Sequence, residues 1–160
     1  MSDALGAREK QYPLDFLKAF VVNNEREKNN KRHIFYKLSA DTVEKAEKEL
    51  CKKFPEQLKR FYAEIGYGYF CDKEKTDINL LMSPQHIVDY YKGNGNYAYA
   101  EDREFVRADE FVFFELDCSS HMKIKLEGEN AGKVFFGRKE IAKNLEEFIA
   151  KLDEYSGYYF

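Results

Sequence analysis

The chain has 160 residues, of which 44% are hydrophobic, and its formal net charge is −3. This length and composition predict one globular domain whose core needs no disulfide or structural metal, and they exclude an intrinsically disordered chain. The slight acidity gives no electrostatic reason to bind nucleic acid or an anionic membrane. The 14 Phe and 12 Tyr residues are unusual. Because tyrosine hydroxyls need hydrogen-bond partners, we expect many tyrosines to lie half-exposed, as they do at protein interfaces.

Membrane-spanning segments and disulfides are not expected from this sequence. No apolar run approaches the length that crosses a bilayer, and Asp15 and Lys18 interrupt the only apolar segment near the N-terminus, so no signal peptide is expected. The three cysteines, Cys51, Cys71 and Cys118, are odd in number and scattered, unlike a disulfide framework. We therefore expect a cytoplasmic protein.

Helical patterns dominate the first half of the chain. Pro13 opens a first helix, and a polar loop follows it. Asp41 opens a second helix, in which Glu44 completes a capping-box pattern, and Pro55 opens a third helix, which Gly66 ends. A sharp elbow at Pro55 therefore separates the second and third helices. Short strands are expected at residues 34–36, 67–70 and 78–82, before a helix that starts at Ser83-Pro84.

The second half changes to the alternation of strands and then returns to a helix. Buried-strand patterns cover residues 111–116 and 133–136. Between them, polar and apolar residues alternate over His121, Met122, Lys123, Ile124, Lys125 and Leu126, and residues 128–132 supply a hairpin turn. The last helix has apolar residues at helical spacing: Ile141, Leu145, Phe148, Ile149 and Leu152. The order of helices, antiparallel sheet and closing helix predicts an α+β fold.

Two segments carry a resemblance to a known family. Residues 38–68, LSADTVEKAEKELCKKFPEQLKRFYAEIGYG, resemble the helix–elbow–helix core of the SUKH superfamily, and residues 113–152 are similar to its strand, hairpin and closing helix. In this chain Cys51 and Lys52 stand where members often have a glycine, and IGYGYF replaces the usual Asn-Gly-Gly-like turn.

The resemblance implies a fold as well as a family. It implies a single SUKH-like domain over residues 1–160, with a mixed, mostly antiparallel sheet packed by about four to five helices. Residues 1–37 are expected to form an N-terminal helix and a polar loop, and residues 38–160 are expected to form the core.

The same resemblance implies a binding function. Bacterial members look like immunity proteins that neutralise a cognate toxin, often a nuclease, of polymorphic toxin systems, and fungal relatives regulate cell-wall assembly. The family pattern contains no catalytic residue, so it implies no enzyme activity, no cofactor and no metal. We therefore expect an immunity protein whose partner is a toxin with a basic nuclease domain. The alternative is a non-enzymatic interaction or regulatory module like the fungal relatives.

Cys118 and His121 form the sharpest chemical candidate, a thiol and an imidazole three residues apart. Two ligands fall short of a zinc site, and no second pair has a spacing that would complete one. A nucleophile and a base at these positions on a strand end need not face each other. We therefore expect Cys118 in the core and His121 facing solvent, with His33 and His86 also on the surface.

Two further motifs are expected to be ordinary surface features. The segment EREKNNKRHIFYK suggests nucleic-acid binding, with Phe35 and Tyr36 as stacking groups, but Glu25 and Glu27 interrupt its basic residues, so we expect a solvated loop. The glycines of KGNGNY follow a helix, whereas a phosphate-binding loop follows a strand and opens a helix. A helix stop and a turn are expected there.

The segment from Tyr97 to Glu110 is the candidate partner-binding surface. It places two tyrosines at period-two spacing and then five acids against two bases. Tyrosines anchor interfaces at low entropic cost, and carboxylates attract a basic partner. The alternative is a soluble sheet edge, with the tyrosines packed on one sheet face. The expected contacts are Tyr97 and Tyr99 as anchors, Glu101, Asp102 and Glu104 as exposed rim charges, and Tyr67, Tyr69, Tyr90 and Tyr91 as an extension of the patch.

Overall fold

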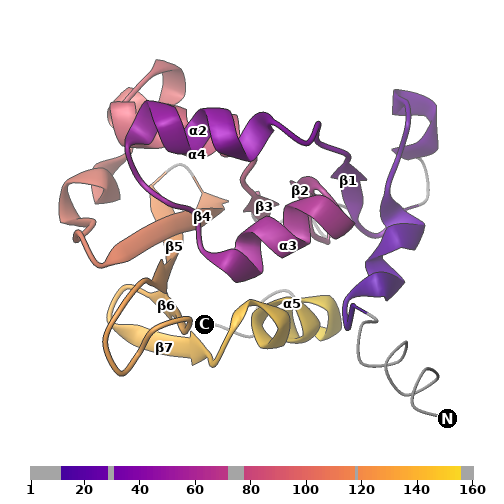
Figure 1. Cartoon of the computed structure of the whole chain (residues 1–160). Coiled ribbons are helices and arrows are strands. Elements are labelled where there is room, and N and C mark those ends of the chain that lie inside the picture. Colours follow the sequence, from indigo (N-terminus) through magenta and orange to yellow (C-terminus); the bar gives the residue numbers. More distant parts are fainter. Residues whose placement is uncertain (1–11, 29–30, 72–77, 118, 156–160) are drawn as a thin grey trace, which may run out of the picture.

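The computed structural model describes residues 12–28, 31–71, 78–117 and 119–155. Over these residues the strands form one seven-stranded sheet in which each strand pairs with the next along the chain, and every such pair is antiparallel (Figure 1). The strands are β1 (Ile34–Tyr36), β2 (Tyr67–Tyr69), β3 (Leu80–Leu81), β4 (Glu110–Asp117), β5 (Ser120–Lys125), β6 (Val134–Phe136) and β7 (Lys139–Ala142). A parallel contact joins Val21 to Phe35 as an isolated bridge. The predicted α+β fold is confirmed.

The helices of the described residues include α-helices and short 3₁₀-helices, here labelled η. The α-helices are α2 (Thr42–Leu50), α3 (Glu56–Glu64), α4 (Pro84–Lys92) and α5 (Leu145–Glu154). The 3₁₀-helices are η1 (Asp15–Phe20), η2 (Glu25–Lys28), η3 (Gly95–Tyr99) and η4 (Glu101–Phe105). None of the helices within these residues is long and apolar enough to cross a membrane.

Two helix starts differ in how they are capped. The Ser83 hydroxyl accepts the amide of His86, and the His86 ring accepts the amide of Ser83, which completes a capping box at the start of α4. The capping box expected from Asp41 and Glu44 is wrong, because Asp41 makes no cap hydrogen bond and its carboxylate lies 2.8 Å from the Lys45 ammonium. The Asp41 carboxylate therefore pairs with Lys45 and does not cap α2.

One face of the sheet carries the aromatic core, which α3 and α5 cover. The Phe61 ring of α3 meets Phe35 of β1 edge-on at 6.1 Å, and Phe148 of α5 meets Phe114 of β4 at 5.1 Å. All four rings are fully buried. Figure 1 shows α3 and α5 beside each other along the sheet. Aromatic side chains from the N-terminal and C-terminal halves of the chain therefore pack in one hydrophobic core.

The opposite face of the sheet is polar, and its position follows from the strand register. Tyr69 pairs with Leu80, Leu80 with Glu115, and Glu115 with His121, so these residues lie in one row on one face. Met122, next to His121, points to the other face into the core. The polar and apolar alternation predicted for β5 is therefore present.

Two expectations about this polar face and the surface are wrong. His121 is buried, because η4 and α4 cover its part of the polar face, and His33 is buried beside Phe20 and Phe70. His86 is half-buried in the capping box of α4. The expectation for Cys118 falls outside the described residues.

The C-terminal quarter contains strand β7, part of which the sequence pattern assigned to the last helix. Ile141 lies in β7, which pairs with β6, and α5 begins only at Leu145. Ile141 and Leu145 are four residues apart, so one pattern fits a strand end followed by a helix as well as one longer helix. The N-terminal helix expected after Pro13 is the 3₁₀-helix η1.

Candidate partner-binding site

The segment from Tyr97 to Phe105 forms η3 and η4, two 3₁₀-helices joined at Ala100, and not a sheet edge. Helix α4 ends before it at Gly93, whose left-handed backbone (φ +68°) is the expected helix stop. The Arg103 guanidinium of η4 packs directly on Gly93, where a Cβ would lie 2.6 Å from Arg103 Nη1. This contact folds η4 back against the end of α4.

The outer side of this segment presents two large aromatic side chains to solvent. Tyr99 is 86% exposed and Phe105 is 72% exposed. Glu101 and Glu104 are exposed between them. Tyr97 is partly buried, so it belongs to the attachment of the segment as much as to its surface. We call Tyr99, Glu101, Glu104 and Phe105 the display face.

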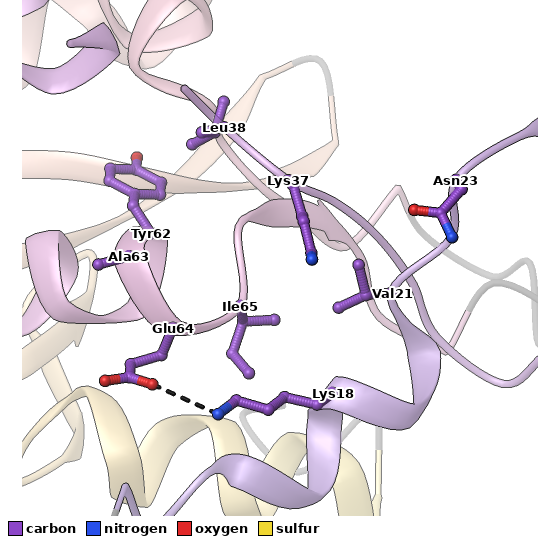
Figure 2. A pocket seen from close by; sticks show the side chains of 9 residues that line it. All are labelled: Lys18, Val21, Asn23, Lys37, Leu38, Tyr62, Ala63, Glu64 and Ile65. Carbon is purple, nitrogen blue, oxygen red and sulfur yellow. Dashed lines mark ion pairs between the residues drawn. The ribbon is translucent and has the colours of Figure 1, made fainter. Parts of the chain in front are cut away.

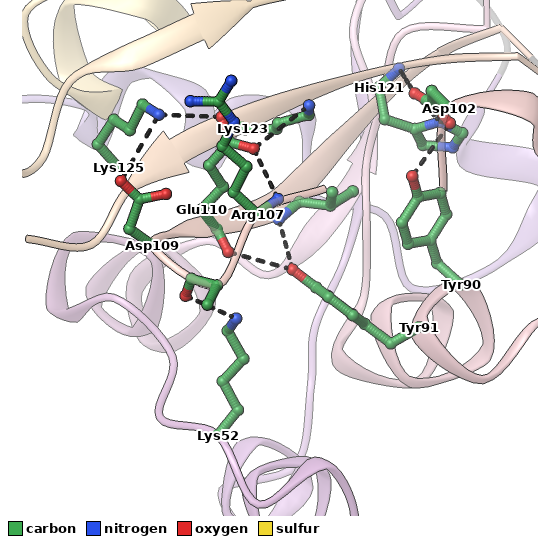
Figure 3. A network of polar contacts seen from close by, with 12 residues as sticks. Lys52, Tyr90, Tyr91, Asp102, Arg107, Asp109, Glu110, His121, Lys123 and Lys125 are labelled. Carbon is green, nitrogen blue, oxygen red and sulfur yellow. Dashed lines mark hydrogen bonds and ion pairs between the residues drawn. The ribbon is translucent and has the colours of Figure 1, made fainter. Parts of the chain in front are cut away.

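The inner side of the segment is attached through Asp102. Its Oδ2 accepts the His121 backbone amide at 2.7 Å, and its Oδ1 accepts the Tyr90 hydroxyl at 3.0 Å (Figure 3). The His121 Nδ1 lies 3.0 and 3.1 Å from the two oxygens. Asp102 is therefore a largely buried attachment point and not the exposed rim charge that the sequence suggests.

The far side of the His121 ring faces a second carboxylate. His121 Nε2 lies 3.4 Å from Glu115 Oε1, which is an ion-pair contact without the alignment of a hydrogen bond. Burial lowers the pKa of His121, but the hydrogen bond and charge of Asp102 and the charge of Glu115 outweigh it, so the pKa is raised above its ordinary value. The ring thus lies between two carboxylates that both favour its protonated form.

Two tyrosines pack against this imidazole. The Tyr90 ring lies 4.5 Å and the Tyr97 ring 6.1 Å from the His121 ring, measured between centroids. Burial, followed by the carboxylates of Asp102 and Glu115 respectively, raises the pKa of Tyr90 and of Tyr97, so both hydroxyls stay neutral donors. Tyr90 of α4 therefore packs against the segment from outside it, whereas Tyr97 is the segment's own inward contact.

The segment is attached a second time at Glu110, where β4 begins. The buried Glu110 carboxylate accepts the Arg107 amide at 2.9 Å and the Lys125 ammonium at 3.0 Å, with Lys123 at 3.5 Å (Figure 3). Burial raises the pKa of Glu110, but these partners outweigh it and lower the pKa overall. The Tyr91 hydroxyl donates to the Glu110 carbonyl at 3.4 Å and accepts the Val112 amide.

A mixed-charge cleft of about 780 Å³ lies beside the display face, between η4 and strands β5 to β7. Phe105 and Phe135 supply apolar walls, and Glu110 neutralises the lysines at its base. Arg107 and Arg138 line its exposed rim. Within the described part of the chain neither arginine forms an ion pair. The cleft therefore places free cations next to the acids of the display face.

A second cleft, of about 540 Å³, lies between η1 and α3 (Figure 2). Lys18 crosses it to Glu64 at 3.4 Å and also pairs with Asp15 at 2.9 Å. Lys37 and Ile65 form part of its remaining lining. No set of groups suited to catalysis converges there among the described residues.

The predicted contact residues divide into three groups. Tyr99, Glu101 and Glu104 lie on the display face, together with Phe105, which the sequence interpretation missed because nothing in the local pattern shows that Phe105 lacks a packing partner. The second group contains the buried Tyr90 and the partly buried Tyr91 and Asp102, whose side-chain oxygens form hydrogen bonds within the protein. The half-buried group contains Tyr67, Tyr69 and Tyr97, of which Tyr67 stacks against Tyr36 and His86 on the β1–β2 side.

Metal-binding groups do not converge in the described residues. No cluster of three His, Cys, Asp or Glu side chains there could hold an ion. Asp102 and Glu115 face opposite nitrogens of His121, so the three side chains cannot share one ion. Cys51 is exposed, whereas Cys71 is buried and its thiol lies 3.6 Å from the Leu152 carbonyl oxygen.

Comparisons with known proteins agree with this architecture. The model of the SMI1/KNR4 family (SUKH-1) matches residues 37–151. A protein of Bacillus subtilis (strain 168) named immunity protein YxxD is 31% identical over 135 residues, which cover 82% of this chain and 91% of that protein. No solved structure matches significantly. The resemblance inferred from residues 38–68 and 113–152 is therefore confirmed, and the chain belongs to the SMI1/KNR4 (SUKH-1) family.

Proposed function

We propose that this protein is an immunity protein, which binds and neutralises a cognate toxin of a bacterial polymorphic toxin system, and that the toxin carries a basic nuclease domain. The family and the name of the Bacillus subtilis relative support the immunity role. The observation that carries the proposal is the display face. Tyr99 and Phe105 are large, mostly exposed aromatics on a segment that hydrogen bonds to Asp102 attach to the domain.

The charge of the display face favours a basic partner. Glu101 and Glu104 are exposed and form no ion pair with the described residues, so their charges remain available to a partner. Such charges accelerate association and exclude partners of like charge. Arg107 and Arg138, across Phe105, would require an acidic group at a matching place on the toxin. Acidic residues on one side of Phe105 and basic residues on the other would favour one orientation of the toxin in the complex.

Inhibition by binding alone agrees with the chemistry of the site. A general base needs an accessible, unprotonated nitrogen, whereas His121 is buried between two carboxylates, which raise its pKa and so favour its protonated form. The exposed thiol of Cys51 has no histidine among its hydrogen-bond partners in the described structure. Occlusion of the toxin therefore accounts for neutralisation without a reaction.

The proposal is tested by binding kinetics with the toxin domain encoded beside the immunity gene, together with survival of cells that express that toxin. Tyr99→Ala and Phe105→Ala should each increase the dissociation rate, by about 30-fold for a true anchor, and reduce survival. Phe16→Ala is the matched control, since Phe16 is an exposed aromatic of η1, which lies away from η4 (Figure 1). Unchanged dissociation in both display-face variants would place the contact elsewhere.

A further inference from the structure

Two histidines are buried in this fold, and their partners demand different protonation states. The Cys71 amide donates to His33 Nδ1 at 2.9 Å, and His33 Nε2 lies 2.6 Å from Asp153 Oδ1. A nitrogen that accepts a hydrogen bond carries no proton, so His33 satisfies these partners as a neutral imidazole. In His121, by contrast, each ring nitrogen faces a carboxylate. Because an ionised carboxylate can only accept, Nδ1 carries the proton of the hydrogen bond to Asp102, and the Glu115 charge beside Nε2 favours a second proton there.

We propose that His121 is a proton-dependent clamp on the display face: as an imidazolium it holds η3 and η4 in the partner-binding arrangement, and loss of its proton releases them. The inference rests on the proposed function, since it concerns the same surface. His121 does not contact the partner, because its side chain is buried. It is a positioning residue that acts through Asp102.

The charged and titratable groups around the ring come from four elements. Asp102 comes from η4 and Glu115 from β4, while Tyr90 of α4 and Tyr97 of η3 contribute neutral hydroxyls. Arg103 of η4 lies close enough to act on the Tyr90 hydroxyl, and it packs at the end of α4. Two carboxylates therefore flank one imidazole ring.

Deprotonation would leave those two carboxylates buried on either side of a neutral ring. Glu115 is fixed within the central strand β4, whereas Asp102 lies on a five-residue 3₁₀-helix. The repulsion and the lost charge-assisted hydrogen bond therefore act on the more weakly held element. Tyr97 and Asp102 are the inward attachments of η3 and η4, so the display face moves with them.

The direction of the pH dependence follows from the raised pKa of His121 in the folded protein. Such a group stabilises the folded arrangement fully below the pKa of the unfolded chain, here 6.5, and this contribution is lost as pH rises through the folded pKa. The segment is therefore held most tightly below pH 6.5 and is released as the pH rises through the raised pKa of His121 in the folded protein.

The test uses the free protein, so it does not depend on the identity of the toxin. An NMR titration follows the ring protons of all three histidines, and amide hydrogen exchange of residues 97–105, corrected for the intrinsic pH effect, reports opening of the segment. We expect His121 to titrate above the ordinary value and His86, whose burial lowers its pKa, to titrate below it. We expect the equilibrium constant for opening of residues 97–105 to increase about ten-fold or more between about pH 6 and about pH 9. This is the size of effect that the loss of one hydrogen bond to a charged group produces.

Two variants separate a clamp from a merely structural histidine. His121→Asn retains a donor to Asp102 but cannot titrate, so opening of the segment should lose its excess pH dependence. Glu115→Gln removes one carboxylate at nearly constant volume, so the midpoint of release should move to lower pH together with the His121 titration. Glu129→Gln, on the exposed hairpin, removes an equal charge and should leave both midpoints unchanged.

The inference would be overturned by a His121 that titrates at or below the ordinary value, or by a segment whose exchange follows the same pH dependence as α5. Should His121→Asn fail to fold, the shift in Glu115→Gln decides the matter alone. In the toxin-binding assay, dissociation should accelerate between the same two pH values in the parent and not in His121→Asn. If exchange of the segment shows no His121-dependent pH effect but the toxin still binds through Tyr99, only this inference is refuted. If the pH effect is present but the toxin does not bind, the proposed function is refuted.

Discussion

Replacement of Asp102 by alanine should destabilise the protein far more than replacement of its neighbour Glu101 by glutamine. The two acids are adjacent in the sequence, but Glu101 is exposed, whereas the Asp102 side chain is only 21% exposed. Asp102 accepts the Tyr90 hydroxyl, the His121 amide and the His121 ring. Both substitutions remove one negative charge, so the comparison isolates the buried hydrogen bonds.

The expected cost follows from the donors that the alanine would leave without a partner. A buried donor that loses its acceptor costs about 1–3 kcal/mol, and Asp102→Ala strands the Tyr90 hydroxyl and the His121 amide. Water can reach the exposed fifth of the site, and the repulsion between Asp102 and Glu115 disappears, so the lower part of the summed range applies. We expect a loss of about 2–4 kcal/mol, against about 0.5 kcal/mol or less for Glu101→Gln.

Urea titration followed by circular dichroism measures both changes as free energies of unfolding. Hydrogen exchange of residues 97–105 should accompany it, because η3 and η4 can open locally before the sheet unfolds. An Asp102→Ala variant with parent-like stability and parent-like exchange would mean that Asp102 is not an attachment point. Equal losses in the Glu101 and Asp102 variants would instead point to charge alone.

Two further predictions concern the framework around the site. Phe54 is 2% exposed and meets Phe111 at 4.7 Å, so Phe54→Ala should cost about 3–5 kcal/mol in urea titration, and a loss below about 1 kcal/mol would mean that the elbow ring is not a core residue. Gly93→Ala combines a left-handed backbone with a clash against Arg103, so its melting temperature should fall clearly, whereas Gly128→Ala, also left-handed but in open space, should show only the smaller backbone strain. Equal melting temperatures in the two glycine variants would mean that the contact between Gly93 and Arg103 does not contribute to stability.

Local signals account for the elements that could be predicted from the sequence. Pro55 and Ser83-Pro84 mark helix starts through backbone restriction and capping, and α3 and α4 begin where these signals stand. The strands β4 and β5 follow from short-range alternation and a glycine turn. Each of these features depends on residues within one or two turns of the chain.

The site depended on contacts that no local pattern contains. His121 occupies a polar position of an alternating strand, and it is buried because Asp102 of η4, nineteen residues earlier, and Tyr90 of α4 cover it. His33 is buried with Asp153, which lies 120 residues further along the chain. The period-two spacing of Tyr97 and Tyr99 suggested a strand, but Gly95 and the attachment through Asp102 favour 3₁₀ turns instead.

The strictly sequential order of the sheet has a consequence for how the chain folds during synthesis. Since every strand pairs with the one that precedes it, the sheet can lengthen as each strand leaves the ribosome, with little loop-closure entropy at each step. The hydrogen bond between His33 and Asp153 is different, because it joins the residue just before β1 to α5, the last helix of the described residues. We therefore expect nascent chains that end before α5 to contain the paired strands without the contact between His33 and Asp153. Protease resistance should appear only when residues near Asp153 have been made.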